Sequence, residues 1–145
     1  MHSATRCGRG VLLINPAGWQ KESINLGLCL LAASLEPAGF DARVLDLNRY
    51  PLDDESLLDK VALYRPSLIG VSVKTATAIE AARIAALLRV RCPGARIVAG
   101  GPHVTLCAED YLREFPSFDY ALMGEAEESI VRLAAALDAD EDRRG

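Results

Sequence analysis

The chain has 145 residues, 50% of them hydrophobic, and a formal net charge of −4, which together are typical of one globular domain with its own core. Because Lys and Arg are dispersed among acidic residues, we expect no nucleic-acid partner. No run reaches the roughly 18 apolar residues of a membrane-spanning helix, and residues 1–10 lack an apolar signal region, so we expect a soluble cytoplasmic protein without a membrane role.

Segments typical of strands and helices alternate along the chain. An apolar run over residues 10–14 predicts the first strand, which Asn15 and Pro16 end because proline disfavours continuation. Residues 26–36 are rich in Leu and Ala on nearly every side, which predicts a helix buried nearly all round. Residues 40–47 predict the second strand.

The middle and the end of the chain repeat this alternation. Asp53 is placed to cap a helix that ends near Tyr64, and Thr75 begins a helix to about residue 91. The other elements are a third strand over residues 68–73, a fourth over 95–99, a helix over 108–114, a fifth strand over 118–122 and a last helix with Ile130, Leu133, Ala134 and Leu137 on one face.

This order of elements is typical of a parallel sheet with helices on both faces. We expect an α/β, flavodoxin-like (Rossmann-like) three-layer sandwich whose five parallel strands run in the order 2-1-3-4-5. We expect residues 1–9 to be a disordered N-terminus and residues 10–137 to form the domain. Residues 138–145 are charged, which predicts a polar tail that is a frayed end or the start of a linker.

Small and polar residues follow the third and fourth strands, at the sheet edge where open α/β sheets bind ligands. Gly100 and Gly101 let a ligand approach the backbone because they lack a Cβ, and Pro102 stiffens the exit, although a plain turn also accounts for them. Ser72 and Thr75 offer hydroxyl groups at the neighbouring strand, although capping a helix is enough to account for Thr75 alone.

Further residues in the loops at the same edge are polar or aromatic. Gly124 is followed by Glu125 and Glu127 at a helix start, where carboxylates also have a purely structural role with the helix dipole. His103 can donate, accept or ligate a metal, although loop histidines are more often plain surface groups. Trp19 can lie against a flat ligand or pack over the sheet edge.

Several motifs occur in a fixed order over residues 11–137. They are residues 12–16, 26–28, 32–36 and 39–40, Ser72-Val73-Lys74-Thr75, residues 97–105 and residues 124–127. Together they resemble the N-terminal cobalamin-binding domain of cobalamin-dependent radical S-adenosylmethionine enzymes of the class B methyltransferase type. The Gly-Gly-Pro-His-x-Thr run at residues 100–105 is the most specific of these motifs.

The resemblance implies cobalamin as the cofactor, with its corrin over the strand ends and its nucleotide tail in a pocket between sheet and helices. A leucine at Gly101 is expected to fill that pocket and abolish binding while leaving the fold intact. The residues that the resemblance places at the cofactor are Ser72, Thr75, Gly100, Gly101 and Gly124 around the pocket, Asn15, Trp19 and His103 nearer the corrin, and Pro16, Pro102, Thr105, Glu125 and Glu127 in the same motifs.

Two positions depart from related patterns. Methionine-synthase-like cobalamin domains carry Asp-x-His-x-x-Gly after the first strand, with the histidine on cobalt, whereas this loop reads Asn-Pro-Ala-Gly-Trp-Gln over residues 15–20. The first loop therefore supplies no metal ligand. Cobalt then has no protein ligand below, or takes water or another side chain, for which His103 is a candidate. Ala126 stands where the family often has a glycine.

The cysteines do not form the Cys-x-x-x-Cys-x-x-Cys motif that holds the iron–sulfur cluster in the family's catalytic domain. Cys7, Cys29, Cys92 and Cys107 lie far apart, and we expect reduced thiols, with Cys29 filling a small apolar space in its helix. S-adenosylmethionine and the cluster would then belong to a radical S-adenosylmethionine catalytic domain on the same or a separate polypeptide. We therefore expect this chain to be the cobalamin-binding module of a methyltransferase and not to be catalytic alone.

Other functions of the same fold fit the sequence to different degrees. A stand-alone cobalamin carrier or sensor, and a flavodoxin-like domain for another cofactor such as flavin, both remain open because they use the same edge. A dehydrogenase is disfavoured because no Gly-x-Gly-x-x-Gly follows the first strand. A phosphoacceptor receiver domain needs an aspartate where this chain has Val71-Ser72-Val73.

Overall fold

The computed structural model describes residues 9–19 and 24–144. The predicted disordered N-terminus, apart from Arg9, lies outside the described residues, as do Cys7 and Gln20. Within the described ranges, no helix combines the length and the apolar character needed to cross a bilayer.

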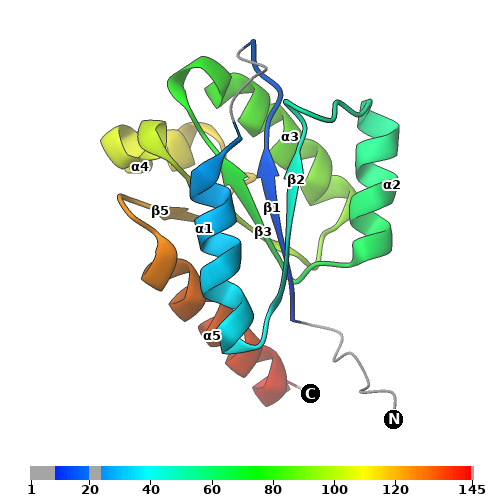
Figure 1. Cartoon of the computed structure of the whole chain (residues 1–145), viewed down its shortest axis with the longest axis vertical. Coiled ribbons are helices and arrows are strands. Elements are labelled where there is room, and N and C mark those ends of the chain that lie inside the picture. Colours follow the sequence, from blue (N-terminus) through cyan, green and yellow to red (C-terminus); the bar gives the residue numbers. More distant parts are fainter. Residues whose placement is uncertain (1–8, 20–23, 145) are drawn as a thin grey trace.

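A five-stranded parallel sheet forms the centre of the molecule, in the order β2-β1-β3-β4-β5 (Figure 1). The flavodoxin-like fold and the order 2-1-3-4-5 predicted from the sequence are confirmed. In the middle of the sheet, Leu13 of β1 lies opposite Val44 on one side and Gly70 on the other. The strands are β1 (Gly10–Asn15), β2 (Asp41–Asp46), β3 (Leu68–Ser72), β4 (Arg96–Gly100) and β5 (Tyr120–Leu122).

Helices cover both faces of the sheet because strand side chains alternate between two apolar clusters. Leu13 and Val98 point to the face covered by α1 and α5, which bury Leu28 and Ile130 there. The opposite face packs against α2, α3 and α4. The helices are α1 (Leu26–Leu35), α2 (Asp54–Tyr64), α3 (Ala78–Arg91), α4 (Pro102–Glu114) and α5 (Glu127–Arg144), with short 3-10 turns at Glu36–Ala38 and Thr75–Thr77.

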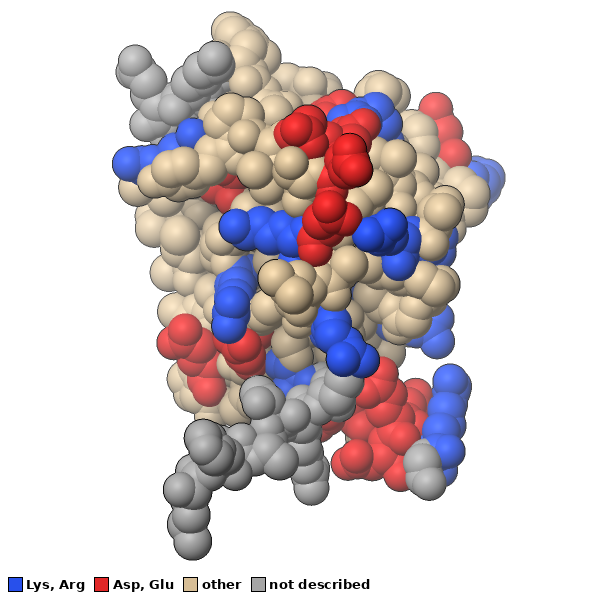
Figure 2. Space-filling view, turned by 90° about the vertical axis from the view of Figure 1, so that its right-hand side faces the viewer, with Lys and Arg blue, Asp and Glu red and all other residues tan. Residues whose placement is uncertain are grey.

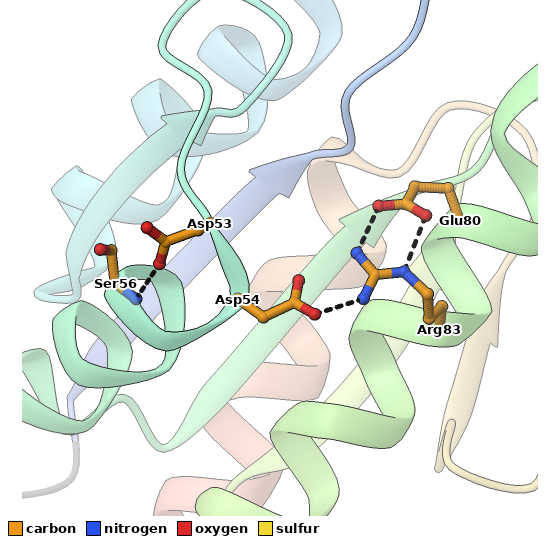
Figure 3. A network of polar contacts seen from close by, with 5 residues as sticks. All are labelled: Asp53, Asp54, Ser56, Glu80 and Arg83. Atoms are coloured by element: carbon orange, nitrogen blue, oxygen red, sulfur yellow. Dashed lines mark hydrogen bonds and ion pairs between the residues drawn. The ribbon is translucent and has the colours of Figure 1, made fainter.

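Polar contacts begin α2 and join it to α3 (Figure 3). The Asp53 side chain caps α2, as predicted, by accepting from the backbone N–H of Ser56 at 2.7 Å. Arg83 of α3 donates to both carboxylate oxygens of Glu80 and reaches across to Asp54 of α2 at 2.8 Å. Figure 2 shows that acidic and basic side chains are interleaved on the side of the molecule that carries α2.

Two predicted helix starts were wrong. Thr75 does not cap a helix, because it opens a 3-10 turn and α3 begins only at Ala78. The fourth helix begins at Pro102 instead of residue 108, so His103 and Thr105 are helical residues. Proline is favoured in a first helical turn because its missing N–H needs no partner there. The early start was missed because Val and Thr have weak helix propensity.

Two predictions of burial were also wrong. Only one face of α1 is buried, and Leu26 and Leu30 on its outer side are 67% and 47% exposed. Cys29 is exposed too, so it fills no apolar space. The last helix continues through Arg144, beyond the end predicted for the domain at residue 137. Asp138 pairs there with Arg9 at 2.8 Å.

Candidate functional site

A cavity of about 340 Å³ opens at the carboxyl ends of the strands, between the sheet and helices α1 and α5. Its lining comes from β1, β3, β4 and β5, from both helices and from the loops that follow the strands. The lining includes Leu13, Asn25, Gly27, Leu28, Gly70, Ser72, Lys74, Val98, Gly100, Gly101, Pro102, Gly124, Glu125, Glu127 and Ile130.

Glycines in the strands make room for the cavity. A Cβ on Gly70 would lie 2.8 Å from Cδ2 of Leu13, so any side chain there displaces part of the cavity floor. Gly100, two residues after Val98, faces the same side of the sheet, where a Cβ would meet only a carbonyl oxygen at 3.9 Å. The structure therefore has an open cradle that side chains at these positions would fill.

A chain of hydrogen bonds connects three strands to the start of α1. The Asn25 side-chain amide donates to Oδ1 of Asn15 at 3.2 Å and to Oγ of Ser72 at 3.1 Å. Its own oxygen accepts from the backbone N–H of Leu28 at 3.2 Å and so caps the helix. Asn15 in turn donates to Asp46 at 2.9 Å. Asn25 thus fixes the Ser72 hydroxyl group and the end of α1 at the cavity wall.

Sequence reasoning missed Asn25 as a site residue. The available signal was an asparagine directly before an apolar helix, which predicts a cap. Its position between Asn15 and Ser72 depends on the order of strands in the sheet, so the local sequence could not show it. Gly27, Gly70 and Lys74 also line the cavity and were not predicted.

Three predicted site residues at the end of β1 and in the loop after it lie outside the cavity lining. Asn15 is only 3% exposed, and its side chain is used by the hydrogen bonds to Asn25 and Asp46. Pro16 is exposed. Trp19 is 80% exposed, so its indole does not pack over the sheet edge, which was one of its two predicted positions.

Site candidates at the ends of β4 and β5 lie in the cavity lining. Gly100, Gly101 and Pro102 form one part of the wall, and Gly124, Glu125 and Glu127 form another. Glu127 occupies the first turn of α5, where a carboxylate interacts favourably with the helix dipole.

The structure requires a glycine at position 101 for a different reason from the one expected. Its φ of +111° lies in a region that L side chains rarely adopt, and a Cβ would lie 2.8 Å from the carbonyl oxygen of Val73. The expectation that a leucine at this position leaves the fold intact is therefore wrong, because the side chain collides with the backbone after β3. Gly101 allows two strand exits to approach closely.

Thr75, His103 and Thr105 do not line the cavity but connect the loops around it. Thr105 Oγ1 donates to the carbonyl of Gly101 at 3.0 Å and accepts from the N–H of Gly124 at 2.9 Å. The His103 ring nitrogen Nδ1 lies 3.2 Å from Thr75 Oγ1. These contacts join the exits of β3, β4 and β5 at the rim.

The aromatic group behind His103 is also held in place. The Tyr111 ring meets the His103 ring edge-on, with centroids 5.6 Å apart, and its hydroxyl donates to the carbonyl of Ala78 at 2.8 Å. Burial raises the pKa of Tyr111 to about 12, so the phenol stays protonated and remains a donor. Among the described residues, no group of three or more His, Cys, Asp and Glu side chains could hold a metal ion.

Residues 19–134 match the protein-family model that describes the B12 binding domain. The chain belongs to the B12-binding domain family. Over 119 residues this B12-binding domain is 34% identical to the anaerobic magnesium-protoporphyrin IX monomethyl ester cyclase of Synechocystis sp., covering 81% of this chain and 24% of that protein. Over 138 residues it is 32% identical to the tryptophan 2-C-methyltransferase of Streptomyces laurentii. That alignment covers 88% of this chain and 23% of the methyltransferase.

A solved relative has the same fold. The radical S-adenosylmethionine methyltransferase TsrM from Kitasatospora setae, determined with cobalamin and a [4Fe-4S] cluster bound, aligns with a TM-score of 0.83 at 26% identity. The alignment covers 92% of this B12-binding domain and 27% of the TsrM chain. The resemblance to the cobalamin domain of radical S-adenosylmethionine enzymes is confirmed, and the chain spans about a quarter of the length of these relatives.

Proposed function

We propose that this domain binds cobalamin and presents it to a radical S-adenosylmethionine catalytic domain, on the same or a separate polypeptide, in a methyltransferase. The cavity with its glycine cradle carries the proposal, because it lies at the edge where α/β sheets bind ligands. The catalytic partner would hold S-adenosylmethionine and the iron–sulfur cluster, since this sequence lacks the three-cysteine motif.

The residues around the cavity fit a nucleotide tail. The tail ends in a flat, largely apolar base, for which Leu13, Val98 and Ile130 provide apolar walls. The Ser72 hydroxyl accepts from Asn25, so its own proton is available to donate to an acceptor in the cavity. We propose that the tail enters between the sheet and α1 and α5.

The corrin would then lie over the strand ends, and the exposed Trp19 indole is free to contact it. When bound, cobalamin supplies a cobalt atom that accepts and passes on a methyl group. The protein's part is to hold the tail through Ser72, which Asn25 positions, and to keep the rim rigid through Thr105.

A titration with hydroxocobalamin tests this proposal. The protein is mixed with cofactor and separated by gel filtration, and the absorption spectrum of the protein peak is recorded. We expect corrin bands in that peak, shifted to positions typical of a base that has left cobalt. A colourless peak from protein with native circular dichroism would overturn the proposal, and binding of flavin mononucleotide instead would identify a different cofactor.

We propose further that cobalt takes no ligand from His103. Its Nδ1 lies 3.2 Å from Thr75 Oγ1 and its ring meets the Tyr111 ring edge-on, so the imidazole is held among the loops of the rim. Electron paramagnetic resonance of the protein loaded with cob(II)alamin should therefore be the same for the parent protein and His103→Ala. A nitrogen splitting that disappears in the variant would instead identify His103 as the ligand below the corrin.

A further inference from the structure

Lys74 is the one Lys or Arg among the residues that line the described cavity. It lies two residues after the end of β3, and its backbone is fixed by the 3-10 turn that comes next. Its N–H donates to Thr77 Oγ1 at 3.3 Å, and its carbonyl accepts from the Thr77 N–H at 3.0 Å. The start of the side chain is therefore held at the cavity wall.

The ammonium group of Lys74 has no carboxylate within 4.0 Å among the ion pairs of the described residues. The acidic lining residues are Glu125, which is exposed, and Glu127, in the first turn of α5. Neither pairs with Lys74. Helices α4 and α5 also begin at the cavity, so the positive ends of two helix dipoles face the same space. The described part of the cavity thus has a positive charge without a carboxylate partner.

The nucleotide tail of cobalamin carries one negative charge, on the phosphodiester that joins the ribose to the corrin side chain. Cobinamide has the corrin but lacks the nucleotide and its base. We propose that Lys74 pairs with this phosphodiester, and that the domain thereby selects complete cobalamins over cobinamide. The inference rests on the proposed function and adds a residue that determines specificity.

Binding titrations with three variants test this role. Lys74→Met removes the charge, Lys74→Arg keeps it, and Lys60→Met removes an exposed lysine of α2 on the other side of the sheet. We expect Lys74→Met to raise the Kd for hydroxocobalamin by about 10- to 100-fold, as for a lost hydrogen bond between charged groups. Lys74→Arg and Lys60→Met should stay within about threefold of the parent protein.

Two further readouts separate ion pairing from a structural effect. In Lys74→Met, the Kd for hydroxocobalamin should depend less on salt, and the Kd for cobinamide should not change. The single phosphorus resonance of bound cobalamin should also move in Lys74→Met and not in Lys60→Met.

The inference is overturned if Lys74→Met binds hydroxocobalamin as tightly as the parent, if it weakens cobinamide equally, or if the parent protein binds cobinamide as tightly as cobalamin. If the parent protein binds neither hydroxocobalamin nor cobinamide, the proposed function itself is refuted. Circular dichroism of each variant excludes unfolding as the cause of lost affinity.

Discussion

Gly100 and Gly101 are adjacent in sequence, but their missing side chains matter for different reasons. Gly100 faces the cavity, where a Cβ would have space, whereas a Cβ on Gly101 would meet the backbone of Val73. A change at the first position should therefore affect ligand affinity, and a change at the second should affect the fold. The Gly-Gly pair in the sequence predicts a loop at the end of the fourth strand, but it does not show that the two glycines have different roles.

We expect Gly100→Leu to weaken hydroxocobalamin binding by about 10- to 100-fold, because the side chain occupies space that the ligand needs. The control is Gly94→Leu, since a Cβ on Gly94 meets no atom within 4 Å and Gly94 does not line the cavity. Absorbance titration measures both affinities. Equal affinity of the two variants would remove Gly100 from the site.

Gly101→Ala should lower the free energy of unfolding by about 3 kcal/mol, because a positive φ and a close backbone contact both disfavour the methyl group. Urea denaturation followed by circular dichroism measures this change. Gly124→Ala is a matched control, since its φ of +71° is also positive but a Cβ would meet no atom within 4 Å. A loss no larger than that of the control would show that the contact with Val73 is relaxed easily.

Asn25 combines a helix cap with a link to the cavity, and a variant can separate the two. Asn25→Asp keeps an oxygen to accept from Leu28 but cannot donate to Ser72. We expect about a tenfold loss of affinity for hydroxocobalamin with unchanged helix content by circular dichroism. Asp53→Asn, the reverse exchange at the cap of α2, should leave affinity unchanged. Parent-like affinity in Asn25→Asp would contradict the positioning role.

At the scale of whole elements, Arg83 of α3 pairs with Asp54 of α2 and, within α3, with Glu80 (Figure 3), and the pair with Glu80 responds to acid. The Arg83 guanidinium holds the pKa of Glu80 below its ordinary value of 4.5. A carboxyl whose pKa is lowered by folding stabilises the folded state above its unfolded pKa, and this contribution disappears as pH falls through the folded value. The Glu80–Arg83 ion pair within α3 should therefore stabilise the fold less below about pH 4.5.

We expect Glu80→Gln to reduce the dependence of stability on pH in this acid range. Urea midpoints of the parent protein should fall between pH 6 and pH 3 more steeply than those of the variant, with the difference confined to the region below about pH 4.5. Glu55→Gln, in the first turn of α2, is a suitable control because it takes no part in the Arg83 contacts. Parallel pH profiles for parent and Glu80→Gln would show that the ion pair contributes nothing measurable.

The strands were predictable because short, continuous apolar runs bounded by turn residues are typical of buried strands, as in residues 10–14. The beginning of α4 was not, because His103, Val104 and Thr105 have weak helix propensity and depend on Pro102 and tertiary contacts. The surface position of α1 was also hidden, since a helix that is apolar on every side has no periodicity to show which face is exposed.

The same distinction holds for the candidate site. Residues next to strand ends, such as Ser72 and Gly124, could be predicted because parallel strands bring their carboxyl ends to one edge. Thr105 and His103 are on that edge but turn toward neighbouring loops, which only the packing decides. Gly70 lies inside a strand, where the sequence pattern indicates only a strand residue.

At the scale of the whole molecule, the outer face of α1 is notable because the inner face of the same helix lines the cavity. Leu28 faces the cavity, whereas Leu26 and Leu30 are exposed. The helix therefore has apolar side chains on both sides within one turn.

The division of the chain into residues 1–9, 10–137 and 138–145 stays a prediction.

The pairing of Arg9 with Asp138 has a consequence for how the domain can be connected. Arg9 precedes β1 at the amino end of the sheet, and the C-terminal half of α5 comes back to it, while the cavity opens at the carboxyl end (Figure 1). Both ends of the folded unit therefore lie on the side away from the opening. Polypeptide attached at either junction can leave the domain without crossing the mouth, so a reporter protein fused there should not obstruct ligand entry.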